Sequence, residues 1–164
     1  MELQAAFETR RSIRHYDPEK KVTKEQVETL IKAASLAPSW KNTQTSRYYC
    51  ILSEDKIEEV REKCLPEFNS AGAGALIVTT FVKGLVGFNK EGIAENEVGD
   101  GWGYYDLGLQ NENLLLKATE LGLDTLVMGI RDAAPIREIL NVPETENVVA
   151  VIAVGYKAKE ASMP

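Results

Sequence analysis

The 164-residue chain has few of the residues that build metal or disulfide sites, with only two cysteines and one histidine. Structural zinc sites need four Cys or His ligands at short spacing, so we expect no metal. Cys50 lies in an apolar, strand-like run and Cys64 at the end of a helical one, which favours free thiols over a disulfide. For His15 we expect a role at the surface.

Long apolar runs are also missing, and none approaches the roughly 20 residues that span a bilayer. The first residues contain no apolar block followed by a small-residue cleavage site, which argues against secretion. We therefore expect a cytoplasmic protein without a membrane partner. The length fits a single domain, residues 1–164.

Positive charge is in deficit, since the formal net charge is −6. An acidic chain repels a polyanion, so we expect no nucleic-acid partner. A glycine-rich phosphate loop after the first strand is absent as well. Gly72-Ala73-Gly74 precedes a strand, and the glycine run at 99–103 follows a long polar segment, so neither has the context of a dinucleotide fingerprint.

Hydrophobic periodicity predicts helices that alternate with strands. The second helix has the clearest start, because Thr23 and Gln26 form a capping box and Val22 and Val27 stand at staple positions. We also expect Ser53 and Asp132 to cap helices. The predicted helices cover 2–9, 53–64 and 102–121, and two more begin at 23 and 132. The predicted strands are 47–52, 75–82, 123–128 and 147–155.

This alternation by itself favours a doubly wound parallel sheet. The helix at 102–121 is apolar on more than one side, which predicts burial at the middle of a domain or in a dimer interface. Residues 83–101 have no clear period, and a loop of that length is usually functional or mobile.

Two segments carry candidate chemistry. Arg10-Arg11-Ser12-Ile13-Arg14 places three guanidinium groups and a hydroxyl within five residues. In an extended segment Arg10, Ser12 and Arg14 point to one side, where they can bind a phosphate dianion, although a solvated basic turn explains the cluster equally well. Residues 37–44, APSWKNTQ, are rich in amides and hydroxyls that suit the edge of a heterocycle, but an ordinary polar loop has the same composition.

Together these segments resemble the N-terminal signature of the FMN-dependent nitroreductase family: an Arg-Arg-Ser-x-Arg cluster, a capped helix, then Ala-Pro-Ser-x-x-Asn-x-Gln. Further similarities follow in order along nearly the whole chain. They are Phe68-Asn69, the helix from Tyr105 to Ala118, the run from Leu121 to Gly129, and the strand that ends at Tyr156.

The resemblance implies an α+β fold, a mixed β-sheet flanked by helices in an intertwined homodimer, with FMN at the subunit interface and NADH or NADPH as electron donor. This replaces the parallel sheet. It implies that the phosphate is held by Arg10, Arg11, Ser12 and Arg14, and that the ring is contacted by Asn69, Met128 and Gly129. The partner subunit's flavin would be reached by Pro38, Ser39, Asn42 and Gln44.

The sequence departs from the family's pattern in three places. Thr45-Ser46 replaces a frequent Pro-Trp pair, and the segment 83–101 is short beside the insertions of larger members. Where many members have a late basic residue for the phosphate, only Lys157 and Lys159 are available. The acceptor specificity of the family therefore does not transfer to this chain.

The implied activity is reduction of a nitroaromatic, quinone or related acceptor by a ping-pong mechanism. The cofactor supplies the chemistry, so we assign no catalytic side chain. Two alternatives stay open. One is a flavin enzyme of the same family that reduces enones, dehalogenates or dehydrogenates, and the other is a flavin-binding or interacting dimer without turnover.

Overall fold

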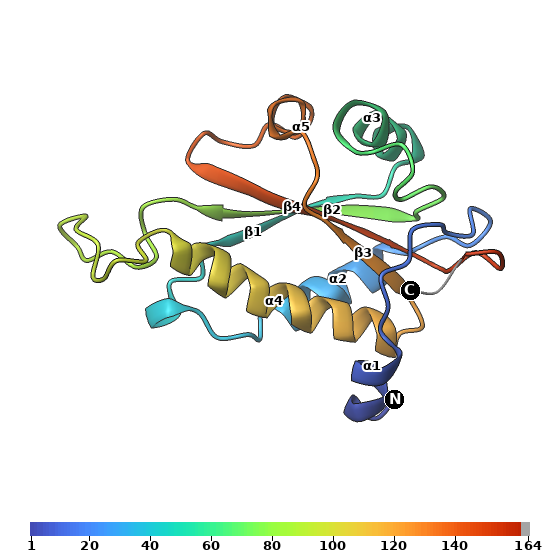
Figure 1. Cartoon of the computed structure of the whole chain (residues 1–164), viewed down its shortest axis with the longest axis horizontal. Coiled ribbons are helices and arrows are strands. Elements are labelled where there is room, and N and C mark those ends of the chain that lie inside the picture. Colours follow the sequence, from blue (N-terminus) through green and yellow to red (C-terminus); the bar gives the residue numbers. More distant parts are fainter. Residues whose placement is uncertain (162–164) are drawn as a thin grey trace.

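The fold is built on one four-stranded sheet in the order β1-β2-β4-β3. The computed structural model describes residues 1–161. Figure 1 shows α3 and α5 above the sheet and α2 and α4 below it. The elements run α1 (Leu3–Thr9), α2 (Lys24–Ala34), η1 (Trp40–Asn42), β1 (Ser46–Ile51), α3 (Glu54–Cys64), β2 (Ala75–Val82), α4 (Gly101–Glu120), β3 (Asp124–Met128), α5 (Ala133–Leu140) and β4 (Glu146–Gly155).

Neighbouring strands of the sheet are all antiparallel, so the parallel sheet expected from helix–strand alternation is wrong. Ile51, the last residue of β1, pairs with Leu76 near the start of β2. α3 leads the chain away from this point, and the turns of segment 65–74 bring it back to the same end before β2 begins. The parallel component of the sheet is an isolated bridge between Ser12 and Thr125 at the edge of β3.

The two central strands bury both of their faces because their side chains alternate with a period of two. In β2, Leu76 and Val78 pack in the core under α3 and α5, whereas Ala75 and Ile77 pack against α2 and α4. These four side chains have no solvent exposure. The uninterrupted apolar run that predicted a central strand thus feeds two cores at once.

Helix boundaries follow the sequence signals closely, with one exception. The capping box of Thr23 and Gln26 is present, and the Asp132 carboxylate accepts the Ala134 amide at 3.1 Å, so both predicted caps are confirmed. Ser53 occupies the N-cap position of α3, but its side chain makes no capping hydrogen bond, so this detail of the prediction is wrong. Glu54 and Asp55 in the first turn supply favourable charge at that helix end instead.

Both cysteines are free thiols, as predicted. Within residues 1–161, no helix combines the length and apolar character needed to cross a bilayer.

Close packing between α4 and β2 depends on Gly103. A methyl group at this position would overlap the ring of Phe81, which is fully buried. We predict that Gly103→Ala lowers the free energy of unfolding by about 1–3 kcal/mol through overpacking. Urea denaturation at one fixed protein concentration measures this.

Phe81→Leu provides the control, since it makes room for the added methyl group. Gly103→Ala should cost clearly less in the Phe81→Leu background than in the wild type. Additive effects of the two substitutions would contradict the contact.

Candidate functional site

The basic segment at residues 10–14 is fastened to the edge of β3. The Ile13 amide donates to the Thr125 carbonyl at 3.0 Å, and the Ile13 side chain is completely buried. Because side chains alternate along extended backbone, this anchor turns Ser12 and Arg14 to the side away from the core. The segment is therefore held in place by its backbone, while its polar side chains stay available for a ligand.

A second basic segment, distant in sequence, lies alongside the first. The Ala158 amide donates to the His15 carbonyl at 3.1 Å, and Lys157 forms a β-bridge with Tyr16. The Lys157 amide also donates to the Asp124 carboxylate at 2.8 Å. The chain around Lys157 thus lies beside His15 and Tyr16, directly after the strip of residues 10–14 that carries the arginine cluster. No contact of the described residues places Lys159 at the cluster, so its role stays a prediction.

The cations of these two segments have no carboxylate partners. Within residues 1–161, none of the ion pairs of the chain involves Arg10, Arg11, Arg14, Lys157 or Lys159. Three arginines within five residues that form no ion pair among residues 1–161 are unusual in a chain of net charge −6, although the Asp124 carboxylate lies near Tyr16 at the same edge. Such a cluster suits a phosphate dianion, which can accept charge-assisted hydrogen bonds from several guanidinium groups.

The far end of β3 continues this strip with groups suited to a flat heterocycle. The Asn69 carboxamide oxygen is buried and has no hydrogen-bond partner among the described residues. Gly129 has open space where a side chain would be, and the nearby Val127 and Ile130 are 45% and 75% exposed although they are apolar. A buried polar atom without a partner and uncovered apolar surface are both features that a bound ligand can satisfy.

The segments that carry these residues are held next to one another. The Asp132 amide donates to the Cys64 carbonyl at 2.8 Å, so the chain after β3 lies against the end of α3, which leads to Asn69. From Thr125 to Met128 the strand covers roughly 10 Å, at about 3.3 Å per residue. A ligand with an anionic end, a linking chain and a ring, as in FMN, fits this set of residues.

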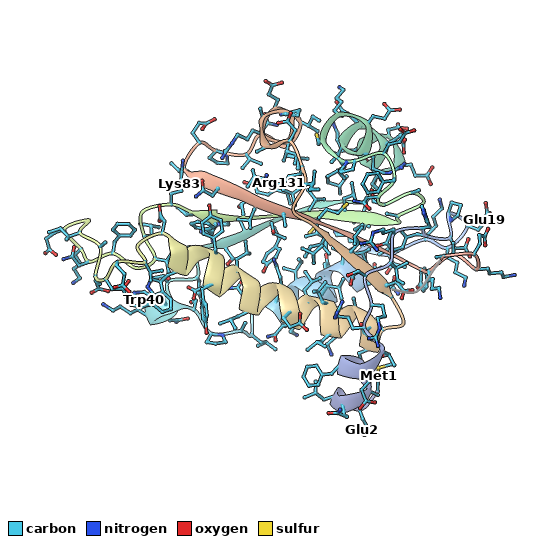
Figure 2. The ribbon with its side chains drawn as sticks, in the orientation of Figure 1. Met1, Glu2, Glu19, Trp40, Lys83 and Arg131 are labelled. Carbon is cyan, nitrogen blue, oxygen red and sulfur yellow. The ribbon has the colours of Figure 1, made fainter. Side chains whose placement is uncertain are left out.

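The loop 38–44 lies at the opposite end of the molecule. Figure 2 places Trp40 far from Glu19, which belongs to the loop that follows the basic segment. A single chain therefore does not bring Pro38, Ser39, Asn42 and Gln44 to the cations of residues 10–14.

Backbone strain marks this loop as unusual. Lys41, Asn42 and Gln44 have φ of 45°, 55° and 52°, the left-handed region that side chains other than glycine rarely adopt. The Gln44 backbone amide donates to the Ser39 hydroxyl at 3.2 Å, and the Gln44 side-chain amide donates to the Asn42 side-chain oxygen at 3.0 Å. Strained non-glycine residues cluster at functional sites, where the surrounding structure holds them.

Asp106 on α4 is a site residue that the sequence analysis missed. Its side chain is 3% exposed, and it accepts the Trp40 amide at 2.8 Å. Burial raises the pKa of this carboxyl group, and the hydrogen bond from Trp40 acts in the opposite direction. The sequence could have indicated Asp106, because it is an acidic residue on a largely apolar helix and a buried carboxylate usually has a specific partner.

Aromatic stacking joins the same loop to the start of α4. The Trp40 and Trp102 ring centroids are 4.5 Å apart, and Tyr105 packs edge-on against Trp102 at 5.5 Å. Both tryptophans therefore belong to one aromatic cluster at the start of α4. Lys41 adds an ion pair with Glu95 at 2.5 Å, which ties the loop to the segment 83–100.

A sheet flanked by helices with an arginine-rich strip along one edge suits proteins that bind a phosphorylated cofactor. Comparison with known sequences makes this specific: the profile of the nitroreductase family matches residues 7–156. The chain belongs to the nitroreductase family. It is accordingly an NAD(P)H oxidoreductase that uses FMN, with NADH or NADPH as donor, so the predicted cofactors and enzyme class are confirmed.

Individual relatives agree with this assignment. A protein of Archaeoglobus fulgidus, named as an NADH dehydrogenase/NAD(P)H nitroreductase, is 29% identical over 93% of this chain and 83% of its own length. A nitroreductase family protein of Clostridium difficile superposes with a TM-score of 0.81 at 24% identity, covering 99% of this chain and 88% of its own. A nitroreductase of Desulfovibrio desulfuricans, solved in complex with FMN, gives 0.76 at 24% identity, over 99% and 90%. These superpositions confirm the predicted α+β fold class.

The left-handed conformation of Gln44 can be tested by its energetic signature. A side chain in this region costs roughly 1–2 kcal/mol relative to glycine. We therefore expect Gln44→Gly to be more stable than Gln44→Ala by at least about 1 kcal/mol in urea denaturation, because both variants lose the same side-chain hydrogen bond. Equal stability, or an advantage for alanine, would show that the loop has another conformation in solution.

Proposed function

We propose that this protein is a homodimer that passes electrons from NADH or NADPH through FMN to a nitroaromatic, quinone or related small acceptor. Donor and acceptor use the same place in turn, which gives ping-pong kinetics. The single observation that carries the proposal is the strip along β3, whose arginines form no ion pair among residues 1–161, together with the Asn69 oxygen that has no partner among the same residues. The nitro acceptor agrees with the names of the relatives, and the quinone is what the family resemblance implies.

In this proposal each residue has a role that matches its place in the fold. The phosphate is bound by Arg10, Arg11, Ser12, Arg14, Lys157 and Lys159, and the ring is contacted by Asn69 and by the backbone of Met128 and Gly129. Pro38, Ser39, Asn42 and Gln44 reach the FMN held mainly by the other subunit. The separation of the loop from the cations within one chain supports this division.

An exposed apolar surface supports the second subunit. Leu3, Phe7 and Leu36 are 62%, 51% and 78% exposed, and they lie on α1 and at the end of α2. Between these helices and α4 lies a groove of about 270 Å³, whose walls include Leu3, Leu36 and Leu116. A second copy of the chain covers this surface, since the loop and the strip can form one site only between two copies.

The chain's own residues bind and orient the reactants. FMN supplies the chemistry, because it can take a hydride equivalent from a nicotinamide and return electrons to an acceptor. Guanidinium groups hold the phosphate end in place, and backbone dipoles near Gly129 favour negative charge at the ring end. No side chain is required as acid or base, so we assign none as catalytic.

Steady-state kinetics distinguish this proposal from its alternatives. FMN-loaded protein should oxidise NADH or NADPH rapidly with a nitroaromatic or a quinone, with parallel double-reciprocal plots as the acceptor concentration varies. Faster turnover with enones or halogenated compounds would favour another reaction of the family. Stoichiometric FMN without NAD(P)H oxidation by any acceptor would favour a flavin-binding dimer without turnover.

The phosphate role of the arginine cluster makes a separate prediction. The double substitution Arg10→Ala and Arg14→Ala should weaken FMN binding by about 100-fold or more, because each charge-assisted hydrogen bond contributes roughly 1.5–3 kcal/mol. Riboflavin has no phosphate, so its affinity should change by less than about threefold. Flavin fluorescence titration measures both.

Lys56→Ala is the matched control, since it removes a cation near the start of α3, away from the helix end that contacts Asp132. It should leave both flavin affinities unchanged. Equal weakening of FMN and riboflavin by the arginine substitutions would contradict the phosphate role.

A further inference from the structure

Asp106 is a buried carboxylate with a single partner. Among the described residues it makes one hydrogen bond, from the Trp40 amide, and no ion pair. Burying a charge with so little compensation costs free energy, and an apolar side chain of similar size would pack on α4 without that cost. The presence of a carboxylate at position 106 is therefore best explained by the hydrogen bond that it accepts from Trp40.

The group that it holds is the strained loop. Residues 38–44 supply no side chain to either core cluster, and the first buried residue after them is Thr45. Three left-handed residues make the observed conformation unfavourable by itself. The loop therefore depends on contacts with residues outside it. One of these contacts is the hydrogen bond from the Trp40 amide to the buried carboxylate of Asp106.

We propose that Asp106 is a positioning residue: through the Trp40 backbone it fixes the loop 38–44 in the conformation that presents Asn42 and Gln44 to the FMN of the other subunit. This inference rests on the proposed function. It assigns a role to a residue that touches neither the cofactor nor the acceptor.

Two further contacts extend this anchor to the segment 83–100. Lys41 pairs with Glu95, and the Trp102 indole N–H donates to the Asn96 side chain at 3.0 Å. Because Trp102 stacks on Trp40, the loop and this segment form one packed unit. Loss of the Asp106–Trp40 hydrogen bond should therefore raise the KM for the acceptor and also weaken the binding of flavin.

The chain offers a probe that does not depend on FMN. Its only two tryptophans are Trp40 and Trp102, which stack on each other, so exciton coupling in the circular dichroism spectrum reports this cluster alone. We expect Asp106→Ala to lose most of this signal in the FMN-free protein. We expect Asp106→Asn to keep it, because the amide oxygen can still accept the Trp40 amide.

Flavin affinity should follow the same order. Asp106→Ala should weaken FMN and riboflavin equally, by about tenfold or more, because the loop contacts the ring and not the phosphate. Asp106→Asn should stay within about threefold of the wild type. Glu138→Ala removes an exposed carboxylate from α5 on the other face of the sheet and should change neither readout.

The outcomes separate the anchor from the proposed function. Wild-type protein that binds no FMN would overturn the function, while the tryptophan signal of the variants would still test the anchor. If Asp106→Ala keeps both the signal and the flavin affinities, the positioning role is wrong. If Asp106→Ala fails to fold, amide exchange in the wild type decides: the Trp40 amide should exchange at least about tenfold more slowly than that of Lys41, and equal rates would overturn the proposal.

Discussion

The hydrogen bond from the Ile13 amide to the Thr125 carbonyl is the constraint on which the site depends. It fastens a segment of three arginines to the rim of the sheet without using any of their side chains. The buried Ile13 side chain secures the same point from the core. The chain after β4 runs beside the same segment, since Lys157 bridges to Tyr16. A rigid sheet edge thus carries a concentration of positive charge that a mobile basic tail could not maintain.

The same sheet keeps the two candidate parts of the site apart. The cations lie at one end of the molecule, and the loop with Asn42 and Gln44 is docked at the other, on the first turns of α4 (Figure 1). A two-fold arrangement of identical chains is the simplest assembly that brings such parts together, because it forms two equivalent sites from two incomplete halves. Pairing of two chains would explain both the exposed apolar surface on α1 and α2 and the separation of the cations from the loop 38–44.

Much of the fold was predictable from local signals. The uninterrupted apolar run of β2 and the capping box at Thr23 are local in sequence, and both appear as expected. The strand pairing was not local, since it depends on the return of segment 65–74, and only the family resemblance corrected the parallel sheet. The arginine cluster could be read directly, because three like charges in five residues need no tertiary information.

The remaining parts of the site depend on contacts between distant residues. Asp106 and Trp40 are 66 positions apart, and no local sequence pattern predicts that the Asp106 carboxylate accepts a hydrogen bond from the Trp40 amide. The left-handed conformations of Lys41 and Gln44 were also hidden, because neither residue type favours them. That Arg10 and Arg14 form no ion pair within residues 1–161 could be recognised only after the fold had placed the acidic residues of that part of the chain.

Complementation between two damaged chains tests the shared site most directly. One chain carries Arg10→Ala with Arg14→Ala, the other carries Asn42→Ala with Gln44→Ala, and each alone should bind FMN poorly. When the two are refolded together, random pairing makes half of the dimers mixed, and each mixed dimer has one intact site. The account predicts recovery of about one quarter of the wild-type FMN per chain. Mixed dimers that form but recover no FMN would contradict a site shared between subunits.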